Sequence, residues 1–132
     1  MTPEAFIRKW QGVALKESAS TKEHFLDLCH LLGEPTPIEA DPKGEWFTFE
    51  KGATKAGGGQ GFADVWRRGC FGWEYKGPGQ NLDKAFQQLQ NYTPALEYPP
   101  LLIVSDIQVI RIHTAFTGLV PKTHEIGLEA LR

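Results

Sequence analysis

Apolar side chains recur at helical spacing in two stretches near the start of the chain. The first, residues 3–17, follows a threonine that can cap a helix and opens with a proline and a glutamate, which suit a first turn. The second, residues 20–33, begins with Ser20 and Glu23 at the spacing of a capping box and ends at Gly33. The pattern therefore predicts two consecutive helices.

Shorter apolar stretches downstream have the character of β-strands. Residues 34–44 contain three prolines and no periodicity, which predicts a loop. Strand-forming residues then fill 45–50, 62–66 and 70–76, and Arg-Arg-Gly at 67–69 favours a tight turn. We expect the last two of these strands to pair as a hairpin.

The last third of the chain predicts a helix followed by two more strands. Apolar residues lie on one side of a helix over 82–97, which Pro94 should kink or shorten. Residues 101–104 are continuously apolar, as in a strand buried on both faces, and residues 109–113 alternate. Together these elements predict a mixed α/β domain with two helices at the amino terminus.

Length and charge narrow the kind of partner. At 132 residues the chain is about one domain long, residues 1–132 forming a single unit, and its formal net charge is −2. Residues 51–84, in contrast, hold six basic and three acidic side chains. A nucleic acid would therefore bind along this middle segment. Its candidate phosphate contacts are Lys51, Lys55, Arg67 and Arg68, although basic side chains on an exposed loop or turn need no function.

The glycine-rich segment 51–61 is not a P-loop. A phosphate-binding loop of that kind ends in Gly-Lys-Ser/Thr and leads into a helix, whereas this one leads into a strand. Cys29 and Cys70 have no metal-ligand spacing, and Cys29 lies in an apolar helical pattern typical of a buried thiol. Nothing resembles a secretory signal or an apolar run near the roughly 18 residues of a membrane helix. We expect a cytoplasmic protein with no membrane partner.

Asp64, Glu74 and Lys76 carry the candidate chemistry. Glu74 and Lys76 leave the same face of their strand, and the hairpin can bring Asp64 close to Glu74. Two neighbouring carboxylates favour a hard cation such as Mg²⁺ or Mn²⁺, which can activate water for phosphodiester hydrolysis with help from a lysine. A cross-strand ion pair on a solvated face explains the same residues without catalysis. Spacing alone leaves both interpretations open.

The order of these residues resembles the PD-(D/E)XK nuclease superfamily. Asp64 is followed after nine residues by Glu74-x-Lys76, and Gln88 and Tyr92 match the Gln-x-x-x-Tyr element of its RecB-like branch. Most of residues 4–123 is similar to the amino-terminal endonuclease domain of MmeI-like (type IIL/IIG) restriction-modification enzymes. The matching motifs are 6–10, 49–52, 61–66, 73–77, 99–106 and 112–117.

The resemblance implies a restriction-endonuclease-like, three-layer α/β core with a mixed sheet and flanking helices. Asp64 and Glu74 would be metal ligands, Lys76 the catalytic lysine, and Gln88 and Tyr92 supporting residues beside the site. Two further acids are weaker assignments. Glu23, on the second helix, would be a supporting acid, although helix capping explains it as well. Glu50 would join the metal ligands unless it is a solvated strand end.

The resemblance also implies a larger context. MmeI-like enzymes join this nuclease to an adenine methyltransferase that uses S-adenosylmethionine and to a target-recognition domain. The chain has no Asn/Asp-Pro-Pro-Tyr methyltransferase signature, so we expect an excised domain or a stand-alone relative. The expected partner is double-stranded DNA, and a homodimer would allow both strands to be cut.

Two functions follow from these observations. The first is a Mg²⁺-dependent (or Mn²⁺-dependent) type II restriction endonuclease domain that hydrolyses DNA by activated water. The alternative, motivated by the negative net charge, is a catalytically silent nuclease-fold module that binds DNA or a protein partner.

Overall fold

A mixed six-stranded sheet forms the centre of the chain in a computed structural model that describes residues 1–13, 18–52, 62–77 and 80–131. Neighbours in the sheet are also neighbours in sequence, and every pair is antiparallel except β3 and β4, which are parallel across the α4 crossover. The elements, in chain order, are α1 (Pro3–Trp10), α2 (Ser18–Leu32), α3 (Pro37–Ala40), β1 (Phe47–Lys51), β2 (Ala63–Arg67), β3 (Phe71–Tyr75), α4 (Leu82–Asn91), β4 (Leu101–Ser105), β5 (Val109–Thr114), β6 (Thr123–Gly127) and the short 3₁₀ helix η1 (Leu128–Leu131).

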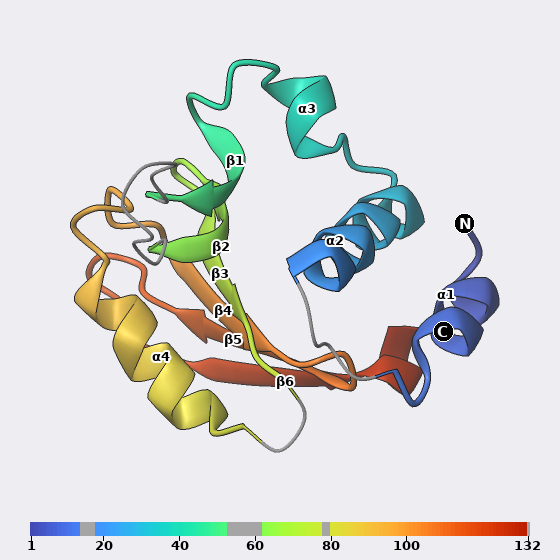
Figure 1. Cartoon of the computed structure of the whole chain (residues 1–132). Coiled ribbons are helices and arrows are strands. Elements are labelled where there is room, and N and C mark those ends of the chain that lie inside the picture. The colour runs from blue at the N-terminus through green and yellow to red at the C-terminus, as the bar shows by residue number, and fades with distance from the viewer. Residues whose placement is uncertain (14–17, 53–61, 78–79, 132) are drawn as a thin grey trace.

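Helices cover both faces of the sheet, so the domain has three layers (Figure 1). On one face, α1 and α2 pack around an aromatic core that includes Phe25, Trp73 and Tyr75. On the other face, α4 covers a smaller core that includes Trp66 and Leu89. The predicted mixed α/β architecture with two amino-terminal helices is confirmed.

The two amino-terminal helices differ from the predicted ranges at their ends. The first stops at Trp10 because Gly12, at a φ of 74°, turns the backbone out of the helix. The second begins at Ser18, so Ser20 lies inside it and the capping box predicted from Ser20 and Glu23 is wrong. Its other end follows the prediction, since Gly33 has a φ of 70°.

The segment 34–44 is more ordered than the predicted loop. It contains α3, whose cap residue Thr36 exchanges hydrogen bonds with Glu39 in a capping box. A helix of four residues is too short to show a helical period. The Thr-Pro-x-Glu sequence was nevertheless a local signal for it.

The central hairpin and the strands after it agree with the prediction. Gly69 occupies the β2–β3 turn with a φ of 69°. As Pro94 predicted, α4 is shortened and ends at Asn91, after which turns follow. The sheet then continues beyond residue 123 into β6, which the sequence pattern did not indicate.

The first and last described elements pack against each other. Leu128 of η1 belongs to the same core as Phe6 and Trp10 of α1. The Gln108 side chain, in the turn before β5, donates a hydrogen bond of 3.3 Å from Nε2 to the Trp10 carbonyl oxygen. Contacts between distant parts of the chain therefore close this side of the molecule.

Candidate active site

Strand β3 sends its side chains alternately to the two faces of the sheet. Trp73 and Tyr75 enter the aromatic core, where their rings stack at 5.4 Å. Gly72 faces the α4 side, since a Cβ at this position would lie 2.9 Å from Leu96. Glu74 follows in the same alternation, and both it and Lys76 lie on the α4 side. One short strand thus supplies core residues to one face and candidate site residues to the other.

Asp64 reaches β3 where the β2–β3 backbone pairing ends. The last backbone pair toward this end joins Val65 and Trp73. Beyond it, Asp64 Oδ2 accepts a hydrogen bond of 2.7 Å from the backbone N–H of Tyr75. A side-chain carboxylate thus replaces the missing strand partner, and this fixes Asp64 beside Glu74. The structure therefore brings these two residues together, as the predicted hairpin required.

The two carboxyl groups share a partly buried environment and lie close enough to influence each other's ionisation. Burial, followed by the charge of Asp64, raises the pKa of Glu74 to about 8, and the nearby Lys76 counteracts the rise. Burial also raises the pKa of Asp64, against the Tyr75 N–H, which favours its charged form. Without a cation, the pair therefore retains a proton at neutral pH.

Lys76 places a positive charge at the edge of the pair. Its Nζ lies 3.9 Å from Glu74 Oε1, and the two side chains are 30% and 19% exposed. The backbone N–H of Lys76 donates to the carbonyl oxygen of Ser105 at 2.7 Å, so β4 holds the backbone of Lys76 in place. The ammonium has water access while remaining close to both carboxylates.

This donor set fits a Mg²⁺ ion rather than a fully protein-bound metal. Across the described parts of the chain, no group of three or more His, Cys, Asp or Glu side chains is arranged to hold a metal ion. Mg²⁺ commonly uses only one or two carboxylates, keeps several waters and takes further oxygens from phosphate. Asp64 and Glu74 supply two such oxygen donors, held together at an energetic cost that a cation would relieve.

Glu50 lies near the pair but is engaged elsewhere. It has a φ of 52°, an uncommon conformation for a residue other than glycine, and its charge contributes to the raised pKa of Asp64. Its carboxylate Oε2 lies 3.7 Å from Nζ of Lys22 on α2, and its side chain is 49% exposed. Its assignment as a third metal ligand stays a prediction.

Helix α4 brings Gln88 to the site and places Tyr92 behind it. Gln88 lines the same polar groove of about 560 Å³ as Lys76. Tyr92 ends the helix and packs its ring 5.1 Å from that of Phe62, two residues before Asp64. The Gln-x-x-x-Tyr element therefore lies beside residues that flank the two hairpin strands, Phe62 before β2 and Lys76 after β3.

The structure does not bring Glu23 to the carboxylate pair. Its side chain is 61% exposed and Oε2 lies 3.7 Å from Nζ of Lys9 on α1. This contact directs it toward the neighbouring helix and not toward β2 or β3.

The predicted phosphate contacts fall in different places. Lys51 stays near the open end of the hairpin, with Nζ 4.2 Å from the Trp66 ring, and Lys55 lies outside the described residues. Arg67 and Arg68 sit at the β2–β3 turn, at the other end of the hairpin from Asp64. Arg68 is paired there with Glu97, its Nε 3.0 Å from Oε2.

Sequence reasoning missed a buried contact directly behind the site. His24 of α2 is 1% exposed, and its Nδ1 lies 2.9 Å from the Tyr75 hydroxyl in a hydrogen bond. Burial lowers the pKa of His24 to about 4, so the ring is neutral at neutral pH. Tyr75 separates Glu74 from Lys76, and this bond therefore ties α2 to the strand that carries both. An aromatic residue between them was the available signal, but its partner lies 51 positions away.

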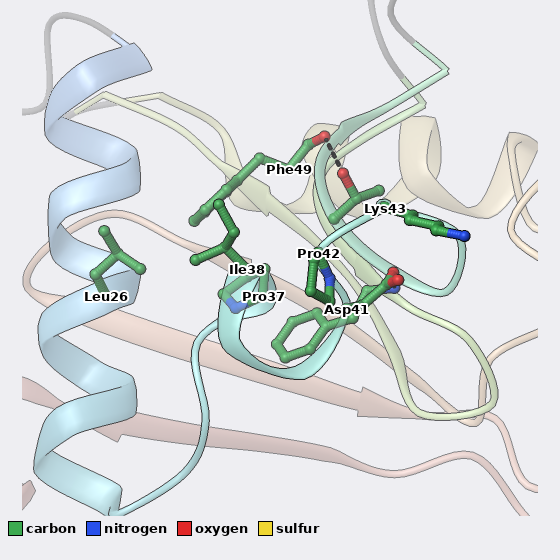
Figure 2. A pocket seen from close by; sticks show the side chains of 10 residues that line it. Leu26, Pro37, Ile38, Asp41, Pro42, Lys43 and Phe49 are labelled. Carbon is green, nitrogen blue, oxygen red and sulfur yellow. Dashed lines mark hydrogen bonds between the residues drawn. The ribbon is translucent and has the colours of Figure 1, made fainter.

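A second hollow, of about 460 Å³, lies elsewhere, among α2, α3 and β1. Figure 2 shows Leu26 of α2 facing Pro37 and Ile38 of α3, with Phe49 nearby. The carboxylate in its lining, Asp41, already accepts hydrogen bonds from the backbone N–H groups of Trp46 and Phe47. Asp64, Glu74 and Lys76 are not among the residues that line this hollow.

Comparisons with known proteins give one result. The search of curated proteins and the search of solved structures each found no match. No helix in the described portions is both long and apolar enough to cross a bilayer. The model of the family described as "MmeI, N-terminal domain" matches residues 1–131, almost the whole chain. The chain therefore belongs to the MmeI N-terminal domain family.

Proposed function

We propose that this chain is a Mg²⁺-dependent DNA-cleaving domain with a restriction-endonuclease-like core. The observation that carries the proposal is the partly buried Asp64–Glu74 pair with Lys76 3.9 Å from Glu74. Perturbed carboxylates beside a lysine are typical of functional sites, because a fold gains no stability from holding two like charges together. Membership of the MmeI N-terminal domain family supports a role in restriction-modification.

Each residue has a defined role in this proposal. Asp64 and Glu74 hold a divalent cation, and the Tyr75 N–H keeps Asp64 in place. Lys76 orients the attacking water and stabilises negative charge on the phosphate. When bound, the cation lowers the pKa of water and stabilises charge at phosphorus. Water attacks phosphorus and one P–O bond breaks, which leaves a phosphate on one strand end and a hydroxyl on the other.

The larger assembly forms part of the same proposal. A domain of net charge −2 gains little affinity for DNA from long-range attraction. Methyltransferase and target-recognition domains in one polypeptide would supply that affinity and the sequence specificity. A pair of such domains would cut both strands.

A catalytically silent module is the second candidate, favoured by the formal net charge of −2, which does not attract DNA. Titration with Mn²⁺ separates the two functions. We expect the wild-type chain to bind Mn²⁺ and Glu74→Gln to weaken binding by at least about tenfold, since even outer partners of metal ligands contribute that much. Glu34→Gln, on an exposed carboxylate, is the matched control.

Cleavage of duplex DNA at high protein concentration gives the second test. We expect Lys76→Ala to lower the rate by about 100-fold or more, as loss of a group that assists proton transfer does. Lys43→Ala, at an exposed lysine away from the pair, should retain the wild-type rate. Metal binding unaffected by Glu74→Gln, or cleavage unaffected by Lys76→Ala, contradicts the proposal.

A further inference from the structure

The groove beside Lys76 has an unusual lining for a protein of negative net charge. Its volume is about 560 Å³, and it lies between the segment that follows β3 and one side of α4. Five carboxamides and two lysines line it, and none of the described residues in its lining is acidic. These residues are Lys76, Gln80, Asn81, Lys84, Gln87, Gln88 and Asn91, together with Ala85.

Helical spacing explains how α4 provides this surface. Lys84, Gln87, Gln88 and Asn91 recur at three- and four-residue intervals, which places them along one side of the helix. Ala85 and Leu89 are buried against the sheet on the adjoining side. The polar side is thus not needed to hold α4 in place.

The one acidic residue of α4 is directed away from the groove. Asp83 Oδ1 lies 2.8 Å from Nη1 of Arg111 on β5. Arg111 also forms an ion pair with Glu125 of β6, with Arg111 Nη2 3.2 Å from Glu125 Oε1. The groove therefore keeps the positive charge of its two lysines, although the chain as a whole is negative.

We propose that this groove is a docking surface for the DNA strand next to the phosphate that is cleaved. Lysines meet phosphate oxygens as charges, and carboxamide NH₂ groups donate hydrogen bonds to phosphate, sugar and base-edge oxygens. Lys76 lines the groove, and its Nζ also lies 3.9 Å from Glu74 Oε1. A DNA strand lying in the groove therefore passes the carboxylate pair. This inference rests on the proposed function for the identity of the ligand.

The mainly neutral lining fits a site that positions DNA brought by other contacts. Each lysine–phosphate contact adds affinity that depends on salt, whereas a carboxamide contact adds directional hydrogen bonds without that dependence. Lys84 and Gln87 should therefore differ in a measurable way. Lys84 should influence the salt dependence of binding and Gln87 should not.

Side-chain NH₂ resonances of the ¹⁵N-labelled chain provide a direct test that also detects weak binding. A short mixed-sequence duplex would be titrated with Ca²⁺ in place of Mg²⁺. We expect the NH₂ signals of Gln87, Gln88 and Asn91 to shift and that of Gln90, an exposed carboxamide of the same helix outside the groove, to shift less. Single substitutions assign each signal.

Variants then separate charge from hydrogen bonding. Gln87→Ala should weaken binding about two- to tenfold, the range for a lost hydrogen bond, with an unchanged salt slope. Lys84→Gln should lower the slope of log K against log salt by about 0.9, the value for one phosphate. Gln90→Ala and Lys43→Gln are the matched controls, and an unchanged backbone spectrum confirms the fold of each variant.

Several results would overturn the inference. They are shifts confined to other surfaces, equal effects of Gln87→Ala and Gln90→Ala, no shift at saturating duplex, or equal shifts with a poly-glutamate peptide. The Mn²⁺ titration tests the proposed function independently. Groove shifts without a Glu74-dependent metal site would defeat the nuclease proposal and leave the docking surface standing, whereas the reverse result would defeat only the docking surface.

Discussion

On one face of the sheet, rings from two helices and two strands pack around one another, whereas the opposite face buries smaller side chains and leaves two carboxylates together. The ring of Phe25 alone lies 5.6 to 6.1 Å from those of Phe47, Phe49, Phe71 and Trp73. Under α4 the core contains mainly Ala63, Ala85 and aliphatic residues around Trp66.

The difference shows how a small domain can hold an unfavourable site. Two carboxyl groups whose pKa values are raised in the folded chain lower the free energy of unfolding at any pH at which they must ionise. The ring contacts of the aromatic face offset that free-energy cost. They do not depend on whether Asp64 and Glu74 are ionised. Strand β3 joins the two, with Trp73 and Tyr75 on one side and Glu74 on the other.

The largest expected effect on stability comes from breaking the aromatic face. Trp73→Ala removes a ring that is 6% exposed and the hydrogen bond from its Nε1 to Ser105 Oγ, at 2.8 Å. We expect the free energy of unfolding to fall by about 3 to 5 kcal/mol, as for other buried aromatic truncations. Lys84→Ala, on the exposed side of α4, should change it by less than about 0.5 kcal/mol. Urea denaturation of both variants checks the contrast, and similar losses would contradict it.

The two faces should also respond to pH in opposite directions. His24 has a folded-state pKa of about 4, so the unfolded chain binds a proton that the folded chain does not, and stability is lost as pH falls from about 6.5 toward 4. Up to about 3 kcal/mol is involved, since one pKa unit corresponds to about 1.4 kcal/mol. Glu74 has a folded-state pKa of about 8, so stability is lost as pH rises from about 4.5 toward 8.

Denaturation across this pH range separates the two groups. His24→Gln should flatten the acid side of the stability profile. Glu74→Gln, which cannot ionise, should be more stable than wild type near pH 8, and Mg²⁺ should reduce that difference by favouring the charged pair. A Glu74→Gln variant with the wild-type slope between about pH 4.5 and 8 would show that the raised pKa of Glu74 is absent in the folded protein.

The smallest effect tests the bond that joins the two faces. Tyr75→Phe leaves His24 Nδ1 without its 2.9 Å partner and should cost about 1 to 3 kcal/mol, the penalty for an unsatisfied buried group. Mn²⁺ affinity should stay close to the wild-type value, because the Tyr75 backbone N–H holds Asp64 and its hydroxyl does not. Calorimetry of unfolding and of Mn²⁺ binding on the same sample measures both, and loss of Mn²⁺ affinity in a folded variant would contradict this separation.

Local sequence patterns predicted much of the fold and part of the candidate active site. Alternation placed Glu74 and Lys76 on one face, and Gly69 marked the turn that brings Asp64 toward them. Strand β6 was not predicted because its side chains are nearly all exposed and show no apolar alternation. The bond from His24 to Tyr75 could not be predicted, since it depends on where α2 packs, which no local pattern specifies.

The packing of α1 against η1 has a consequence for how the chain folds. The β2–β3 hairpin joins residues that are close in sequence, whereas Trp10 and Gln108 are 98 positions apart, and Phe6 packs with Leu128. Local contacts form early and distant ones later, because a longer loop must be closed. During synthesis, α1 can pack against α2 early, whereas its contacts with Gln108 and Leu128 form only after residue 128 has left the ribosome. The side of α1 that contacts η1 is therefore covered later than the side that contacts α2.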